Sequence, residues 1–171
     1  MSSTIIILID MILLRKGPED FPASHSLMII LIMINLIVSI ALASKIHSQT
    51  IAVSLSVLGL IITYIFIKIL LVNKAERFTQ TFSSMVGVSI LIDLISVPVI
   101  FPLLNEDLSQ NIILLFWLLA SALYIWLVVT YGFIISRALS ITLGYGVSIA
   151  AAYVLVSYMI FELIIAGRVA S

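Results

Sequence analysis

The sequence predicts an all-α, polytopic membrane protein, and this prediction depends on its composition and on its long apolar runs. Of its 171 residues, 63% are hydrophobic and only 9% are charged, whereas soluble domains carry about 25% charged residues. The mean hydropathy is +1.35. A soluble fold of this length has too little interior to hide so much apolar surface. We therefore expect a single membrane domain over residues 1–171, with the lipid bilayer as its solvent.

Five apolar runs are long enough, or nearly so, to cross a hydrocarbon core of about 30 Å, which takes roughly 20 helical residues. The predicted transmembrane helices lie at about 27–44, 50–72, 82–104, 111–135 and 139–166. Their connections are short, and the last is a tight "SRA" turn. Ser24 or Ser26 is expected to cap the first span, because a serine hydroxyl can accept from a free N–H of the first turn.

Residues 4–14, "TIIILIDMILL", predict a short apolar helix at the cytoplasmic interface. The segment is too short to span the bilayer. It also lacks the preceding basic residue and the small-residue cleavage site of a signal peptide. The neighbours of Asp10 on the same face are all apolar, so the helix has no polar face. We favour packing against the protein's own bundle, and docking onto another membrane protein is the alternative.

The stretch "RKGPEDFP" at 15–22 follows this helix and is the most polar part of the chain. We interpret it as a hinge at the membrane surface. Gly17 and Pro18 are expected to end the short helix there, and Pro22 marks the approach to the first span.

Basic residues are unevenly distributed between the two sides of the predicted bundle. Two of them, Lys45 and Arg168, fall on the same side of the membrane as the connection between the third and fourth spans, which carries Glu106 and Asp107. The other six fall on the side of the N-terminus: Arg15, Lys16, Lys68, Lys74, Arg77 and Arg137. Basic residues favour the cytoplasmic side. We therefore expect a bacterial cytoplasmic (inner) membrane protein with a cytoplasmic N-terminus and a periplasmic C-terminus.

Several classes of chemistry are not expected from this sequence. The chain contains no cysteine, which excludes disulfides, iron–sulfur clusters and thiolate zinc sites. His25 and His47 fall outside the spans on opposite sides, so they are not expected to share a metal. Eight basic and eight acidic residues balance, which gives no sign of a nucleic-acid partner. No known catalytic or phosphate-binding motif occurs, so we expect no enzyme, no cofactor and no metal.

The candidate intramembrane polar site comprises Ser89, Asp93 and Ser96, which lie on one stripe of the third predicted span. A charged side chain near the middle of a span costs at least about 2.5–3.5 kcal/mol and usually faces the bundle or a wet cavity. Pro98 and Pro102 each remove a backbone donor, so the outer half of this helix is expected to kink. A proton or ion pathway is one interpretation. A structural hydrogen bond to a neighbouring Ser, Thr or Tyr is the interpretation we favour.

The candidate helix-packing stripe comprises Ser140, Gly144, Ser148 and Ala152, small residues that recur every four positions on the fifth span. Small residues let helix backbones approach closely, which is a main source of helix association in lipid. We favour packing against a helix of the same chain, and contact with another protein is the alternative.

Aromatic residues mark the fourth predicted span. Tyr124 and Tyr131 are seven positions apart and share one face, whereas Trp117 and Trp126 lie elsewhere on the helix. Tyrosine and tryptophan often pack in cores or anchor at membrane interfaces. We interpret these residues as packing and interface anchors rather than as a cofactor site.

The stretch "DMILLRKGPEDFPAS" at 10–24 resembles the start of a group of small, uncharacterised inner-membrane proteins of Gram-negative bacteria. A second similar stretch is "RFTQTFSSMVG" at 77–87. The matching positions of the first stretch are Asp10, Leu13, Leu14, Arg15, Gly17, Pro18, Asp20 and Pro22. The wider layout resembles the Yip1 family, with five closely spaced spans and an external C-terminus. That resemblance implies membrane trafficking and small-GTPase partners in eukaryotes, without catalysis, and it assigns no functional residue.

Two functions are compatible with these features. The leading hypothesis is a non-catalytic integral membrane scaffold, assembly factor or accessory subunit of a larger inner-membrane complex, with other integral membrane proteins as partners. The alternative is a small transporter or channel that uses Asp93 and the proline-kinked third span.

Overall fold

The computed structural model describes residues 2–104 and 108–169, and it confirms the all-α fold class. Five of its helices are long and apolar enough to cross a membrane, and no strand occurs within the described residues. The α-helices are α1 (Ser2–Ile12), α2 (His25–Ala43), α3 (Gln49–Leu70), α4 (Phe78–Ile100), α5 (Gln110–Leu139) and α6 (Leu143–Val169). Three short 3-10 helices join them: η1 (Pro18–Asp20), η2 (Ala75–Arg77) and η3 (Phe101–Leu104).

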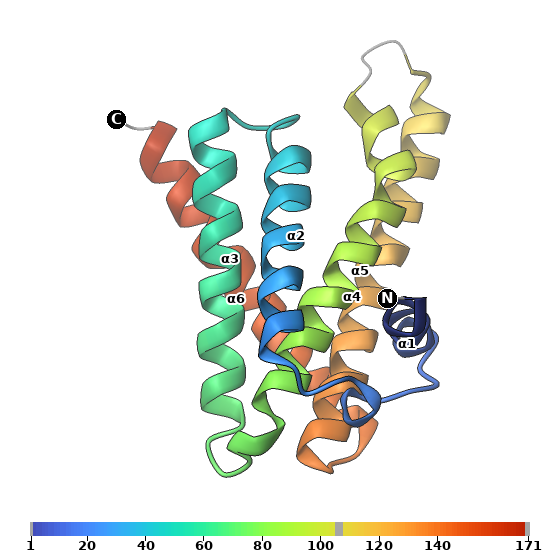
Figure 1. Cartoon of the computed structure of the whole chain (residues 1–171). Helices are drawn as coiled ribbons and strands as arrows, with labels where there is room; N and C mark the ends of the chain where they lie inside the picture. The colour runs from blue at the N-terminus through green and yellow to red at the C-terminus, as the bar shows by residue number, and fades with distance from the viewer. Residues whose placement is uncertain (1, 105–107, 170–171) are drawn as a thin grey trace.

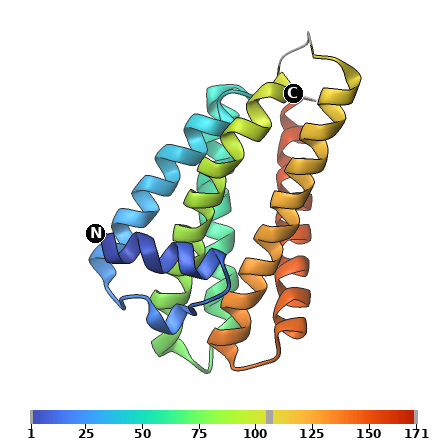
Figure 2. The same cartoon turned by 90° about the vertical axis from the view of Figure 1, so that its right-hand side faces the viewer.

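The long helices lie side by side, and α1 crosses them (Figures 1 and 2). Helix α5 pairs with α6, and α2 packs against both α3 and α4. Helix α4 is the most enclosed, because every residue from Thr81 to Val88 is buried. The core of the bundle therefore surrounds the first half of α4.

Two predicted boundaries on the N-terminal side of the bundle are wrong. Helix α4 begins at Phe78 rather than at 82, and α5 continues to Leu139 rather than ending at 135. The "SRA" segment is thus part of α5, and the turn to α6 begins at Ser140, whose φ of 61° is left-handed. The Ser140 and Ile141 amides close this turn by donating to carbonyls of the last turn of α5. The sequence predicted loops at these two positions because the residues there are polar. Their partners lie on other segments, and a sequence does not show which segments lie together.

Helix α4 also continues past Pro98, the first of the two prolines in the predicted third span. Pro98 lies inside the helix, and the change to 3-10 geometry comes only at Phe101. Because proline has no N–H, the Leu94 carbonyl has no amide partner four residues later. The helix is therefore locally weakened just beyond Asp93 without being interrupted there.

The short helix α1 ends earlier, and by a different residue, than the sequence predicts. It ends at Ile12, and Leu14 adopts a left-handed conformation with φ of 58°. The Arg15 amide then donates to the Asp10 carbonyl at 2.7 Å, as in a Schellman-type helix end. Gly17 is extended, with φ of −97°. The helix is therefore ended by Leu14 and not by Gly17 and Pro18.

The favoured interpretation of α1, packing against its own bundle, is confirmed. Leu8 and Met11 are buried. A Cβ atom at Gly87 of α4 would come within 2.7 Å of the Leu8 side chain, so Gly87 makes room for it. The Trp126 indole of α5 donates to the Ile12 carbonyl at 3.0 Å. This bond satisfies one of the carbonyls left free at the end of α1.

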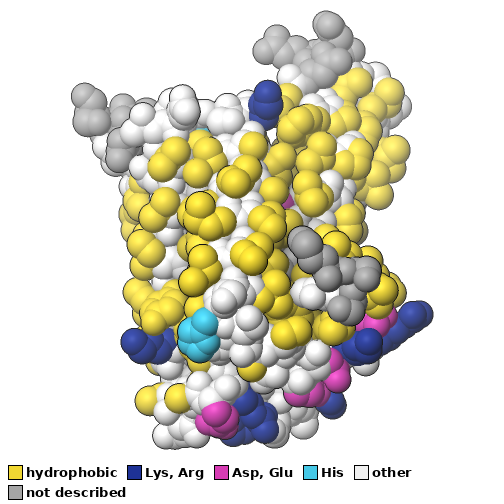
Figure 3. Space-filling view, in the orientation of Figure 1, with side chains coloured by type: hydrophobic (Ala, Val, Ile, Leu, Met, Phe, Trp, Pro, Cys, Tyr) yellow, Lys and Arg dark blue, Asp and Glu magenta, His cyan; other side chains and the backbone are white. Residues whose placement is uncertain are grey.

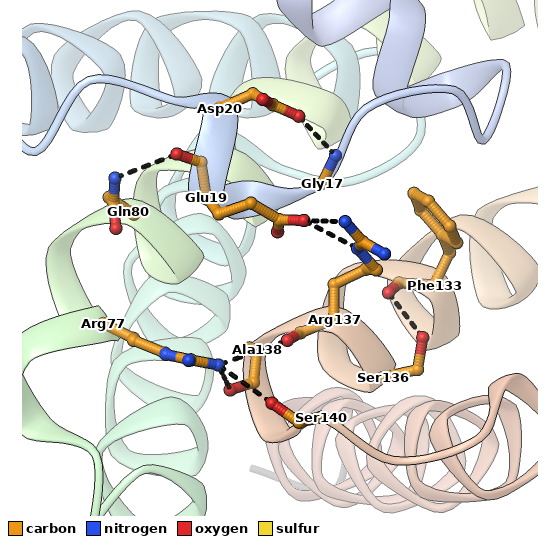
Figure 4. Close-up of polar contacts among 10 residues, drawn as sticks. All are labelled: Gly17, Glu19, Asp20, Arg77, Gln80, Phe133, Ser136, Arg137, Ala138 and Ser140. Carbon is orange, nitrogen blue, oxygen red and sulfur yellow. Dashed lines mark hydrogen bonds and ion pairs between the residues drawn. The ribbon is translucent and has the colours of Figure 1, made fainter.

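A network of polar contacts closes the end of the bundle next to η1 (Figure 4). Glu19 forms an ion pair with Arg137 of α5, and the Gln80 amide donates to the Phe21 carbonyl at 2.8 Å. Arg77 donates to the Ala138 carbonyl at 2.7 Å, and Lys74 donates to the Leu139 carbonyl at 2.6 Å. These cations satisfy the free carbonyls of α5, where the helix dipole is negative.

The predicted small-residue stripe is largely exposed, and it is not the face on which α6 packs against α5. Ser140 lies in the turn before α6, and Gly144, Ser148 and Ala152 of α6 are exposed. A Cβ atom at Gly144 would meet nothing within 4 Å. The face of α6 that packs is displaced by two residues, to the buried Gly146 and Ala150.

Replacing Gly146 by alanine is predicted to destabilise the protein, because the added methyl group would overlap the Gly132 carbonyl oxygen of α5. Overpacking of this kind typically costs about 1–3 kcal/mol. The matched control is Gly144→Ala on the same helix, where the added Cβ meets open space. Unfolding free energies measured in detergent should separate the two variants, and equal stabilities would contradict the packing described for α5 and α6.

Candidate functional site

A cavity of about 410 Å³ lies between the five long helices and is the candidate functional site. We call it the polar cavity. Each of the five helices supplies polar lining, including Asn35 of α2, Ser56 and Thr63 of α3, Asp93 of α4, Tyr131 of α5 and Tyr153 of α6. Polar groups inside a membrane domain usually face the bundle interior or a water-filled space. Their convergence here places several polar side chains around one cavity within an apolar protein.

The polar cavity occupies the half of the bundle away from η1. Along α4 it extends from Met85 to Asp93, a rise of about 12 Å at the usual helical spacing. It reaches the connection between α2 and α3 at Ile46 and His47. Its other end lies at Met85 and Val86, which belong to the fully buried part of α4.

Asp93 lies where the polar cavity meets a smaller cleft of about 230 Å³ between α2 and the outer end of α4. Its side chain is partly buried. Among the described residues, no side chain donates a hydrogen bond to its carboxylate and no basic residue pairs with it. The carboxylate is thus available to bind a ligand from outside the chain.

Ser89 and Ser96, the other members of the predicted site, both lie beside Asp93 but do not bond to its carboxylate. The Ser89 hydroxyl donates to the Val86 carbonyl at 2.8 Å and accepts from the Asn35 amide at 2.9 Å. The Ser96 hydroxyl donates to the backbone carbonyl of Asp93 at 2.7 Å. The favoured interpretation of Asp93, a structural hydrogen bond, therefore finds no partner among the described side chains.

A hydrogen bond between α3 and α6 fixes another part of the cavity lining. Thr63 and Tyr153 are 2.7 Å apart through their hydroxyl oxygens. Thr63 donates its one hydroxyl hydrogen to the Gly59 carbonyl at 2.7 Å, so Tyr153 must be the donor in the bond between them. The Tyr153 ring also stacks on Phe66, with centroids 4.4 Å apart. These contacts fix one tyrosine of the cavity in a single orientation.

Sequence reasoning missed the contributions of Asn35, Thr63 and Tyr153. Asn35 is the one amide within the first span, and that was a usable signal. The other two are ordinary residues of apolar helices, and only the packing of α3 against α6 brings them together. Tyr124 and Tyr131, predicted as anchors, both line the polar cavity.

The described residues hold no group of three His, Cys, Asp or Glu side chains that could bind a metal ion. His25 begins α2 and His47 follows its end, so the two histidines lie at opposite ends of the bundle. Glu106 and Asp107, which entered the prediction of orientation, lie outside the described residues, as does the side chain of Arg168.

The polar cavity is predicted to be accessible to water from the side of the connection between α2 and α3. The chain has no cysteine, so a single introduced thiol reports one position. Ser39→Cys, in the cavity lining, should react with a membrane-impermeant cationic thiol reagent at least about ten times faster than Ile37→Cys. Ile37 is 66% exposed on the lipid-facing side of the same helix, and thiols react through their ionised form, which lipid disfavours. Equal rates would contradict a hydrated cavity.

Comparisons with known proteins do not extend this description. No family model, no curated protein and no solved structure matches the chain. The resemblance to Yip1-like proteins of bacterial inner membranes stays a prediction, and the candidate site is defined by the geometry of the polar cavity alone.

Proposed function

We propose that this chain is a small carrier that binds a polar solute in the polar cavity and moves it across the bilayer. The observation that carries the proposal is the Asp93 carboxylate, which lines a 410 Å³ cavity without a partner among the described side chains. An unpaired carboxylate is costly inside a membrane domain. A solute that supplies the missing interactions would offset this cost.

The shape of the bundle supports transport through alternating states. The cavity reaches the connection that carries Ile46 and His47, and its other end lies at Met85 and Val86, within the buried segment Thr81–Val88. A carrier needs one closed end in each state. The missing backbone bond at Pro98, just beyond Asp93, gives α4 a place to bend. We infer that closing over a solute involves the outer part of α4.

The distribution of charge supports the proposed orientation. Lys and Arg side chains gather at the end of the bundle next to η1, at the bottom of Figure 3. A cytoplasmic location for this end follows the usual bias of basic residues. In a bacterial inner membrane, the polar cavity would then open towards the periplasm.

Asp93→Asn is predicted to abolish the solute flux through this protein, because the amide keeps the size of the side chain but removes its charge. The measurement is osmotic swelling of proteoliposomes in glycerol, alanine, choline chloride or sodium acetate. At least one of the four should enter faster than into protein-free liposomes, and Asp93→Asn should lower that rate at least about tenfold, or roughly 1.4 kcal/mol.

The control for this experiment is Leu94→Ala, which changes the adjacent residue on the exposed side of α4. It should leave the flux unchanged. Absence of flux for all four solutes, or equal flux through the wild type and Asp93→Asn, would show that the cavity is not a transport site.

A second candidate function is that of an accessory subunit or scaffold in a larger inner-membrane complex. It is favoured by the exposed stripe of Gly144, Ser148 and Ala152, where a Cβ atom at Gly144 meets nothing within 4 Å. Small residues on an open helix face allow another helix to approach closely in lipid.

Ser148→Leu is predicted to prevent such an association, because its larger side chain would hold a partner helix away. Co-purification of a partner membrane protein from native membranes in mild detergent should fall, while the variant remains folded and monodisperse. Ile125→Ala, on an exposed part of α5, should not change it. Partner recovery that is unaffected by Ser148→Leu would remove the stripe from any interface.

A further inference from the structure

The charge of the polar cavity indicates the sign of its ligand. Among the described residues, Asp93 is the one acidic residue of the lining, and no Lys or Arg lines the cavity. The ion pairs of the described residues lie elsewhere, between Lys16 and Asp10 and between Arg137 and Glu19. His47, in the connection between α2 and α3, is the one described lining residue that can carry a positive charge. A carboxylate that no basic side chain of the described lining neutralises attracts a cation.

Aromatic rings of α5 and α6 line the same cavity. They belong to Tyr124, Tyr131, Tyr153 and Phe161. The rings of Tyr131 and Tyr153 are tilted by 55°, with centroids 6.2 Å apart, so together they do not form one flat wall. A cation is attracted to the face of an aromatic ring within about 6 Å of its centroid, and quaternary ammonium ligands are commonly held in this way.

The size and the donor set of the cavity do not suit a metal ion. Hard cations such as Ca²⁺ take six to eight oxygen ligands, and the lining offers one carboxylate. The Asn35 amide, a further polar group, already donates to Ser89 at 2.9 Å. A volume of about 410 Å³ instead falls in the range of about 300–1,000 Å³ that is usual for small-molecule sites.

We propose that the solute of the polar cavity is a small organic ammonium compound. Its cationic head lies against the Asp93 carboxylate, and its remaining atoms lie along the tyrosine rings of α5 and α6. This inference deepens the proposed carrier function and depends on the polar cavity being the solute site. It names the class of ligand that the cavity prefers.

The test uses two ligands of the same shape. Choline carries a quaternary ammonium group, and 3,3-dimethylbutan-1-ol replaces its charged nitrogen by carbon. Binding to the purified full-length protein in detergent is measured by calorimetry. We expect choline to bind at least about tenfold more tightly than its uncharged counterpart, and n-butylammonium to bind more tightly than n-butanol.

Substitutions of cavity residues test whether the preference for the charged ligand arises in the polar cavity. Asp93→Asn should abolish the preference for the charged ligand, and Asp93→Glu, which keeps the charge, should retain more of it. Tyr124→Leu should weaken choline binding more than Tyr124→Phe, because phenylalanine keeps the ring. Tyr124 is half exposed, at 50%, so these changes do not empty the core. A monodisperse elution profile confirms that each variant is folded.

The outcomes separate this inference from the proposed function. If neither ammonium compound binds more tightly than its uncharged counterpart, the inference is wrong, whatever the swelling experiment shows. If glycerol or alanine enters proteoliposomes in an Asp93-dependent way while the ammonium compounds do not bind, the carrier function stands with another class of solute. Choline binding that Asp93→Asn leaves unchanged would also overturn the inference.

Discussion

The close packing of Thr81–Val88 in α4 is the constraint on which the rest of the structure depends. Every residue of this segment is buried, including Ser83 and Ser84, whose hydroxyl oxygens have no hydrogen-bond partner among the described residues. Such unpaired groups cost about 1–3 kcal/mol each. The serine side chains are small, so neighbouring helices can approach α4 closely. In lipid, such close packing takes the place of the hydrophobic effect as the source of helix association. Gly87 likewise allows α1 to pack closely against α4, because it leaves space for the Leu8 side chain.

The close packing at one end of the bundle accounts for the position of the polar cavity. Close contacts around α4, and the contact between α5 and α6 at Gly132 and Gly146, bring the helices together at one end. The polar cavity begins beside Met85 and Val86, within this packed segment, and extends along α4 to Asp93. The bond between Asn35 and Ser89 lies along this part of α4 and keeps α2 beside it. The cavity thus has a rigid floor and walls that are held by a few side-chain hydrogen bonds.

The sequence predicted the parts of this protein that depend on local composition. Hydropathy located the five spans, and the rarity of charge within them drew attention to Asp93. The predicted packing face of α6 was displaced by two residues from the observed one. Small residues occur both on the face that contains Gly144 and on the face that contains Gly146. Lipid is as apolar as a protein core, so hydropathy does not distinguish the inward series from the outward one. The remaining cavity residues come from separate helices, and no local pattern relates Thr63 to Tyr153.

The two ends of the bundle differ in a way that locates any motion. At the end next to η1, Arg77 and Lys74 donate to backbone carbonyls of α5, and Glu19 joins the preceding segment to Arg137. These contacts tie α4, α5 and η1 together, so rearranging this end requires several bonds to break at once. At the other end α4 passes through Pro98 and changes to 3-10 geometry at Phe101. A missing backbone bond and a change of helix type both lower the resistance to bending. Bending of the bundle therefore meets least resistance in the outer part of α4, whereas the end next to η1 is held by several side-chain bonds.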